Sequence, residues 1–238
     1  MRISEVYLSI QGEGPRVGEP TIFVRFAGCN LKCAAWPCDS QFAIDPQYRE
    51  EWQQKTPTEI HNMILDAGAG VSLVNICLTG GEPFLQNKDE LKELVELLDA
   101  TDGIGTIECF SNGTLQYPVW AFVHISFVMD WKLPGSGELS IVDNRLTNFS
   151  FFTEKDAVKF TIADEQDLKF AVELYKKYFE GDSVDTPDTF DQPQVFYGAV
   201  WGKIENQELV EKVLELGLPW RFTMQVHNYI WDRTKRGI

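Results

Sequence analysis

The stretch TIFVRFAGCNLKCAAWPCDS, residues 21–40, joins a strand-like segment to three of the five cysteines in the chain. Its first part, TIFVRFAG, is rich in β-branched and aromatic residues, which predicts a short strand that ends where the first cysteine begins. Three thiols then follow at gaps of three and four residues. The sequence therefore places Cys29, Cys33 and Cys38 in a loop at the carboxyl end of a strand.

Strand and helix patterns alternate along the rest of the chain. The segment Thr56-Pro57-Thr58-Glu59 is a capping box with proline at the first helical position, and Asn87 with Glu90 caps a second helix. Further apolar stripes at helical spacing run from Leu168 to Tyr175 and from Val210 to Gly217. The remaining strands are predicted at 73–78, 104–110, 125–130, 157–162, 195–200 and 221–226.

This alternation predicts an α/β fold with a parallel sheet, and the number of units favours a full or partial (β/α) barrel. With 238 residues and 44% hydrophobic residues, the chain can bury one sizeable core. We expect residues 1–238 to form a single domain with insertions near 39–56, 139–156 and 180–193. The last insertion is acidic.

Composition excludes several classes of protein. A formal charge of −15 without clustered Lys and Arg argues against a nucleic-acid surface, which needs cations for phosphates. The start, MRISEVYLSIQGEG, lacks a basic region followed by an apolar run, and no stretch approaches the roughly 18 apolar residues of a membrane span. We therefore expect a cytoplasmic protein that does not bind membranes. In a reducing compartment its cysteines would be ligands or core thiols.

Polar residues gather just after the predicted strands. The cysteines, the turn of residues 80–83 (GGEP), the segment of residues 111–114 (SNGT), Lys132 and His227 each follow the carboxyl end of a different strand. In parallel (β/α) barrels this is the reactive face. We therefore expect these residues to meet in one site.

The three clustered thiols admit several interpretations. A structural zinc site would need a fourth ligand, and none of the three histidines (His61, His124 and His227) is near the cysteines in sequence. Three thiolates on a four-iron cluster would leave one iron open to a small molecule. Unrelated thiols remain the simplest alternative. Cys77 and Cys109 lie inside apolar strands and are interpreted as packing residues.

Five segments carry a resemblance to a known family. SIQGEGPRVGEPTIFVRFAGCNLKC, LTGGEPFLQ, SNGT, DWKLPGSGE and QVHNYIW resemble the radical S-adenosylmethionine superfamily and, within it, the 7-carboxy-7-deazaguanine synthases. The resemblance implies a single-domain partial (β/α) barrel of the radical S-adenosylmethionine type. It also implies the radical-mediated ring contraction of 6-carboxy-5,6,7,8-tetrahydropterin to 7-carboxy-7-deazaguanine, with loss of ammonia, in the biosynthesis of preQ0 and queuosine.

The resemblance assigns roles to residues of this chain. Cys29, Cys33 and Cys38 would hold a [4Fe-4S] cluster, and Ser40 would help to bind Mg²⁺. The groups that would contact S-adenosylmethionine are Gly80, Gly81, Glu82, Ser111 and Lys132. The groups that would line the pterin pocket are Gln11, Glu13, Arg25 and His227.

Each assigned residue also has a simpler interpretation. Arg25 could be a surface charge, Lys132 a loop cation and His227 a hydrogen-bonded core residue. Glu82 could be a turn residue.

The chain departs from the family pattern at two places. The usual cysteine spacing is C-x3-C-x2-C, whereas Cys33 and Cys38 are separated by four residues here. Related chains often carry a glutamate directly before the turn that corresponds to residues 111–114. Here Phe110 stands at that position, and Glu108 lies two residues earlier.

The family likeness also implies partners, and it leaves rival functions open. The implied partners are the pterin substrate, an electron donor such as flavodoxin or ferredoxin, and a second copy of the chain in a homodimer. A glycyl-radical-enzyme activase shares the cysteine trio, but SIQGEG and QVH would have no evident use there. A ferredoxin-like carrier would need a fully ligated cluster, and a metal-binding regulator would need a nucleic-acid surface. Cleavage of the cofactor and dependence on the pterin distinguish these possibilities.

Overall fold

A single mixed sheet organises the molecule. The computed structural model describes residues 1–33, 38, 40–138, 145–180, 192–232 and 235–237. Within these residues the sheet has nine strands in the order β3-β1-β2-β4-β5-β6-β7-β8-β9. The strands are β1 (Arg2–Ile10), β2 (Pro20–Phe26), β3 (Gln53–Gln54), β4 (Val74–Gly80), β5 (Ile104–Ser111), β6 (Ser126–Asp130), β7 (Ala157–Ile162), β8 (Gln194–Ala199) and β9 (Arg221–Phe222).

Strands β2 and β4 to β9 are parallel, as the alternating pattern predicted. Each of the seven predicted strands is present, although the last covers only Arg221–Phe222 instead of 221–226. Strand β1 was not predicted. It runs antiparallel to both β2 and β3, and the sheet stays open, with β3 and β9 at its edges. The fold is therefore an α/β partial barrel, as expected.

Four helices of ten or more residues connect the parallel strands: α2 (Pro57–Ala67), α3 (Lys88–Asp99), α6 (Glu165–Tyr178) and α7 (Asn206–Glu215). The predicted capping box is formed in both directions. The Glu59 amide donates to Oγ1 of Thr56 at 3.2 Å, and the Thr56 amide donates to the Glu59 carboxylate at 2.8 Å. Asn87 accepts from the amides of Asp89 and Glu90, as its position predicted.

Shorter elements fill the connections. They are α1 (Gln41–Ile44), α4 (Ala121–His124), α5 (Arg145–Phe149), α8 (His227–Ile230), and the 3-10 helices η1 (Gly14–Arg16), η2 (Pro46–Glu51), η3 (Pro83–Leu85) and η4 (Pro134–Ser136). Of the predicted insertions, residues 139–144 and 181–191 lie outside the described part. None of the helices in the described part is long and apolar enough to cross a membrane.

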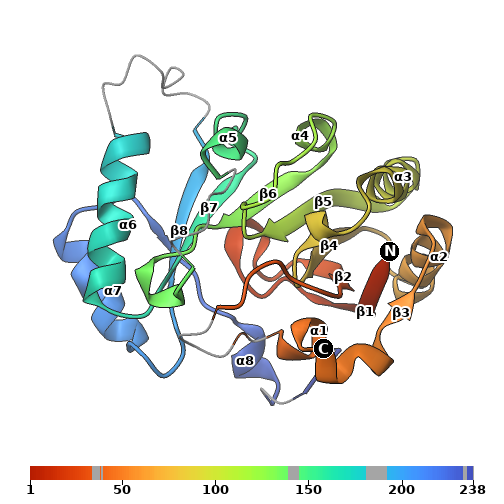
Figure 1. The fold of residues 1–238 in the computed structure, drawn as a ribbon, viewed down its shortest axis with the longest axis horizontal. Coiled ribbons are helices and arrows are strands. Elements are labelled where there is room, and N and C mark those ends of the chain that lie inside the picture. Colours follow the sequence, from red (N-terminus) through yellow and green to blue (C-terminus); the bar gives the residue numbers. More distant parts are fainter. Residues whose placement is uncertain (34–37, 39, 139–144, 181–191, 233–234, 238) are drawn as a thin grey trace.

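The two faces of the sheet have different contents. Helices α2 to α6 form an arc along its outer side (Figure 1), and the main hydrophobic core lies there, with Phe127 and Phe160 fully buried. Among the described residues, the inner side carries a small apolar cluster of Val128, Ala157 and Phe196, against which Phe110 packs. Side chains alternate between faces along a strand, so Glu108, Asp130 and Lys159, each two positions from one of these residues, also point into the barrel.

Candidate functional site

The cysteine loop (residues 28–40) begins directly after β2. Gly28 has a positive φ of 96°, and its amide donates to the Ala43 carbonyl at 2.7 Å, which turns the chain away from the sheet. Sγ of Cys29 accepts from the Leu31 amide at 3.4 Å. Burial raises the pKa of the Cys29 thiol to about 11. Residues 34–37 and 39 lie outside the described part of the chain. The segment between Cys33 and Cys38, where the spacing departs from the family pattern, therefore lies outside it as well.

The GGEP turn at the end of β4 lies against this loop. The Gly81 amide donates to the Phe26 carbonyl at 3.0 Å, and the Glu82 amide donates to the Gly28 carbonyl at 2.9 Å. A methyl group on Gly81 would overlap the Gly28 carbonyl and lie 3.0 Å from the Cys29 nitrogen. Glycine has no side chain, so it lets other groups approach the backbone closely. In the structure the groups that they admit are backbone atoms at the end of β2.

Glu82 is fully buried and binds the SNGT segment. Its Oε1 accepts from the Ser111 hydroxyl at 2.8 Å and from the Phe84 amide at 3.1 Å, and its Oε2 accepts from the Asn112 amide at 2.9 Å. Burial raises the pKa of Glu82, while these donors and the charge of Lys132 oppose the rise. Glu82 therefore fixes the end of β5 relative to the end of β4.

Asn112 was not singled out from the sequence, yet it connects three parts of the site. Its amide nitrogen lies 3.8 Å from Sγ of Cys29 and 3.1 Å from Oδ1 of Asn30. Its Oδ1 accepts from the hydroxyl of Thr114 at 2.6 Å, and that hydroxyl accepts from Asn30 at 2.7 Å. The signal was present in the SNGT motif, because an Asn two residues before a Thr is typical of a side-chain-capped turn.

Lys132 follows β6 and faces the cysteine loop. Its Nζ donates to Oδ2 of Asp130 at 2.8 Å. Burial lowers the pKa of Lys132, but the Asp130 carboxylate and the thiols of Cys33 and Cys38 raise it more, so the net shift is upward and the side chain stays cationic. Lys132 lies in the loop after β6, and because its side chain is only 16% exposed it is not a freely solvated cation.

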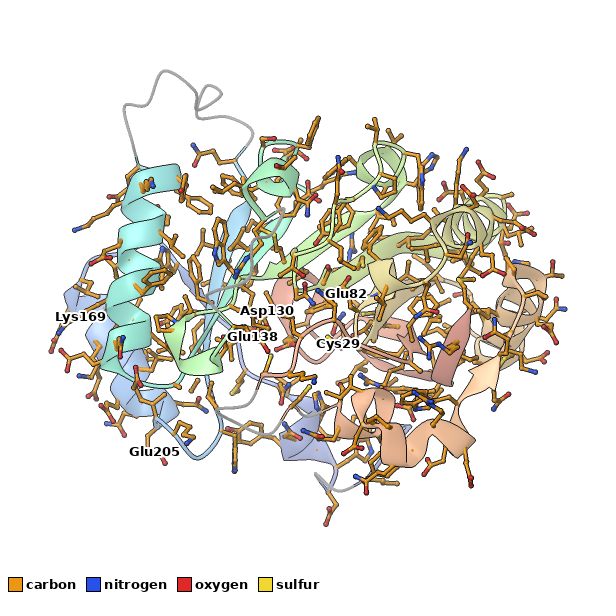
Figure 2. All side chains as sticks on the ribbon, in the orientation of Figure 1. Cys29, Glu82, Asp130, Glu138, Lys169 and Glu205 are labelled. Atoms are coloured by element: carbon orange, nitrogen blue, oxygen red, sulfur yellow. The ribbon has the colours of Figure 1, made fainter. Side chains whose placement is uncertain are left out.

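A second acid supports the loop from the same segment. The carboxylate of Glu138, in the DWKLPGSGE motif, accepts from the Lys32 amide at 2.6 Å. Figure 2 shows Cys29, Glu82, Asp130 and Glu138 near the middle of the molecule, with Lys169 and Glu205 at its periphery. Together with the hydrogen bonds above, this arrangement brings the ends of β2, β4, β5 and β6 to one site.

The QGE segment (residues 11–13) and the QVH segment (residues 225–227) also meet. The Val226 amide donates to the Gly12 carbonyl at 3.0 Å, and a methyl group on Gly12 would lie 3.1 Å from Cε1 of His227. The Glu13 carboxylate accepts from Lys159 Nζ at 2.7 Å. Lys159, on β7, was not predicted, and no local pattern could have revealed it because 146 positions separate it from Glu13.

Arg25 does not face solvent, which overturns its interpretation as a surface charge. Its side chain is 15% exposed and donates to Glu5 at 2.9 Å, to the Ser40 hydroxyl at 2.9 Å and to the Tyr7 hydroxyl at 3.0 Å. Arg25 thus connects β2 to Ser40, at the far end of the cysteine loop. The arrangement brings two candidate residues together and gives each of them a polar partner.

Comparisons with known proteins agree with this geometry. The family model of a 4Fe-4S single cluster domain matches residues 10–120. A 7-carboxy-7-deazaguanine synthase from Clostridium acetobutylicum is 31% identical over 242 residues, covering 100% of this chain and 99% of the relative. One from Koribacter versatilis is 33% identical, with 100% of both chains covered.

The chain belongs to the 7-carboxy-7-deazaguanine synthase family.

The solved structure of QueE from Escherichia coli has the same fold as this family member. It aligns with a TM-score of 0.68 at 20% identity, covering 94% of this chain and 93% of the other. The chain is thus a radical S-adenosylmethionine enzyme with a 4Fe-4S cluster domain, as the sequence resemblance implied. The rival interpretations as a carrier or a regulator are not supported.

The residues of this family member fit an iron-sulfur cluster. Soft thiolates are the usual ligands of such clusters, and three cysteines follow one strand here. The ammonium of Lys132 acts electrostatically on the thiols of Cys29, Cys33 and Cys38, which would offset the negative charge of ligated thiolates. Among the described residues, no three His, Cys, Asp or Glu side chains gather closely enough to hold a single metal ion.

Cys77 and Cys109 are both buried, in agreement with their prediction as packing residues. Cys109 belongs to the main hydrophobic core. Cys77, by contrast, lies where its pKa responds to Glu108, Gln11 and Arg25, so it faces the polar interior of the barrel. Burial is the main cause of the raised pKa at both thiols, which keeps them protonated and chemically inert.

Proposed function

We propose that this chain converts 6-carboxy-5,6,7,8-tetrahydropterin to 7-carboxy-7-deazaguanine, with loss of ammonia, in the pathway to preQ0 and queuosine. The observation that carries the proposal is the full-length similarity to proteins named 7-carboxy-7-deazaguanine synthase. When bound, the cluster and S-adenosylmethionine together supply a hydrogen-abstracting radical. The protein contributes orientation, charge and exclusion of water.

The cofactor end of the site is assigned to the ends of β2, β4, β5 and β6. We assign Cys29, Cys33 and Cys38 to the cluster, and Gly80, Gly81, Glu82, Ser111 and Lys132 to S-adenosylmethionine. Glu82 suits the ammonium group of the cofactor because each carboxylate oxygen can accept two hydrogen bonds, and its Oε2 accepts only one from the protein bonds described. Its bonds to Ser111 and Asn112 would hold that oxygen in a fixed direction.

The pterin end of the site is assigned to Gln11, Glu13, Arg25 and His227. Glu13 can accept hydrogen bonds from the N–H groups of a pterin ring, and the hydrogen bond from Lys159 orients its carboxylate. Gly12 places its backbone against the His227 ring, so both segments would contact the same ligand. The meeting of QGE and QVH supports a pocket between them.

Magnesium binding at Ser40 is part of the proposal. Mg²⁺ takes oxygen ligands and often keeps several waters while it bridges to a substrate. The Ser40 hydroxyl is buried beside Arg25 at 2.9 Å, close to residues assigned to the pterin. Ser40 would therefore supply one oxygen to an ion that also contacts the substrate.

We further propose an electron donor such as flavodoxin or ferredoxin, and a homodimeric assembly. Reduction of the cluster requires an external electron, which the chain itself does not supply. Three thiols that must stay reduced to bind iron also favour a cytoplasmic enzyme. Light scattering on the reconstituted protein tests the dimer, and turnover with each donor in place of dithionite tests the reductant.

The proposed reaction is tested by anaerobic reconstitution with iron and sulfide. The protein is then incubated with S-adenosylmethionine, dithionite, Mg²⁺ and 6-carboxytetrahydropterin, and mass spectrometry follows 7-carboxy-7-deazaguanine and 5′-deoxyadenosine. Cys38→Ala should abolish the product. Cys109→Ala is the matched control, since it removes a thiol from the hydrophobic core and should retain the cluster.

Three outcomes are distinguishable. Product that requires Cys38 supports both the reaction and the cysteine assignment. Cofactor cleavage without the deazapurine contradicts the proposed substrate and directs attention to a protein substrate, as in the glycyl-radical activases. An intact cluster in Cys38→Ala contradicts the assignment of that ligand.

A further inference from the structure

Glu108 is a buried acid in the interior of the barrel, outside the residues assigned above. It lies in the middle of β5, between Cys77 of β4 and Ser126 of β6, and only 2% of it is exposed. A buried carboxyl group needs a polar partner. Its Oε2 accepts from Nε2 of Gln11 at 2.5 Å, and this is a contact between residues 97 positions apart.

Gln11 also contacts the rest of the QGE segment, so its bond to Glu108 affects the position of that segment. Its Oε1 accepts from the Gly12 amide at 2.9 Å, and the Gly12 carbonyl accepts from Val226 at 3.0 Å. An acceptor on the nitrogen side and a donor on the oxygen side define which way a glutamine amide faces. Glu108 therefore selects one orientation of Gln11 and, through Gly12, fixes the backbone that touches His227.

Gln11 is itself buried, with only 2% of its surface exposed, and its side chain also hydrogen-bonds the Cys77 thiol. An amide nitrogen has two hydrogens, and an amide oxygen has two lone pairs. One hydrogen is directed to Glu108 and one lone pair to Gly12. These partners occupy the Gln11 side chain inside the protein, so Gln11 contributes to the pocket by holding the backbone of residues 11–13, and with it Glu13, in place.

We propose that Glu108 is a positioning residue for the pterin: it sets the orientation of Gln11 and holds the QGE segment against His227. This inference rests on the proposed function, because it concerns the pocket assigned to that substrate. Glu108 does not touch the substrate in this proposal and acts through Gln11.

The carboxyl group also borders a cavity of about 240 Å³ on the side where the strands begin. Burial raises the pKa of Glu108 to about 8, and the hydrogen bond from Gln11 lowers it only in part. The charged or titratable groups that face it are Glu13, Arg16, Glu19, Cys77 and, across the cavity, Lys155.

A positioning role therefore predicts a pH dependence. Below pH 8 the carboxyl group is protonated and still offers an oxygen to Gln11. Above pH 8 it becomes an additional negative charge near Glu13, and it repels an anionic carboxypterin. We expect KM for the pterin to rise about fivefold between pH 7 and pH 9 because of this group.

The test compares Glu108→Gln, Glu108→Leu and the control Glu19→Gln. Glu19 borders the same cavity, but its carboxylate binds Arg16 and Asn75, and its contact with Gln11 is a backbone hydrogen bond that the substitution leaves in place. Glu108→Gln keeps an acceptor for Gln11, so KM at pH 7 should stay within about twofold of wild type while the rise toward pH 9 disappears. Glu108→Leu removes the acceptor and should raise KM about tenfold or more, with the iron content unchanged.

The outcomes separate the two proposals. A wild-type enzyme that does not convert the pterin refutes the proposed function and, with it, this inference. A wild-type enzyme that does, together with a Glu108→Gln profile that keeps its rise in KM, refutes the role of Glu108 alone. If Glu108→Leu does not fold, the Glu108→Gln profile still decides, since a flattened profile supports the role. The same flattening in Glu19→Gln would contradict it.

Discussion

Replacing Gly81 by alanine should separate the GGEP turn from the cysteine loop. Gly81 follows the last residue of β4, and its backbone lies against residues 26–29 of the neighbouring strand end. The added methyl group would overlap the Gly28 carbonyl and lie 3.0 Å from the Cys29 nitrogen. These neighbours are backbone atoms, which cannot rotate out of the way. The ends of β2 and β4 must therefore move apart.

The hydrogen bonds between these strand ends set the size of the effect. Separation breaks the bond from the Gly81 amide to Phe26 at 3.0 Å and the bond from the Glu82 amide to Gly28 at 2.9 Å. A buried donor or acceptor left without a partner costs about 1–3 kcal/mol. Two such losses predict a decrease of about 2–6 kcal/mol in the free energy of unfolding, a large part of the roughly 5–15 kcal/mol typical of a domain.

Urea denaturation measures the loss of stability, and iron content after reconstitution measures the effect on the loop. Gly70→Ala is the control, because no atom lies within 4 Å of a methyl group there and its φ of +90° leaves only a backbone penalty of about 1 kcal/mol. Gly81 has no positive φ, so its penalty is steric. A Gly81→Ala protein with normal iron content and a stability loss no greater than that of Gly70→Ala would refute the close approach.

Three further predictions concern other contacts. Burial raises the pKa of Glu108 from 4.5 to about 8. Between pH 4.5 and pH 8 the folded state therefore holds a proton that the unfolded state has lost. The free energy of unfolding should fall with rising pH in this range by about 1.4 kcal/mol per pH unit, or about 5 kcal/mol in total. Glu108→Gln should remove this slope in urea denaturation at pH 5.5, 7 and 8.5, and a persistent slope would assign it to other groups. Asn112→Ala removes the side-chain amide beside Sγ of Cys29. It should speed the loss of iron to a chelator about tenfold, as expected for a group that supports a ligand. An unchanged rate of iron loss would make Asn112 a turn residue only. Phe127→Ala empties a fully buried site stacked on Tyr117 at 4.5 Å, and it should lower the free energy of unfolding by about 3–5 kcal/mol while each folded chain still binds a full complement of iron.

The parallel part of the fold could be predicted because its signals are local. Thr56 and Glu59 are three residues apart and cap the same helix, and a buried strand such as β4 is a continuous apolar run. Strand β1 lacked such a pattern. Most of its residues are partly buried on both faces, because it lies next to the short edge strand β3. The position of β1 is fixed by its pairing with β2, and the sequence of β1 alone does not predict this pairing.

The site was predictable where a residue follows a strand and unpredictable where a residue acts through a distant partner. Glu82 and Lys132 could be found because parallel strands end on the same side. Lys159 and Glu108 point into the barrel from the middle of β7 and β5, and each meets its partner from the N-terminal segment across about a hundred residues or more. In the sequence they look like single charges in apolar strands. Only the path of the QGE segment through the interior explains them.

That path also gives a physical reason for the joint presence of SIQGEG and QVH in one chain. The sheet is open, so its interior needs something to fill it, and the segment of residues 11–16 enters the space next to Phe110 and Val128. The Gly14 amide donates to Oγ1 of Thr223 at 3.0 Å, and Gly12 meets Val226 and His227. Neither segment has a complete set of partners without the other. The two ends of the chain therefore assemble one wall of the proposed pterin pocket, and a change that displaces either end should alter substrate binding before it alters the cluster, whose proposed ligands follow β2.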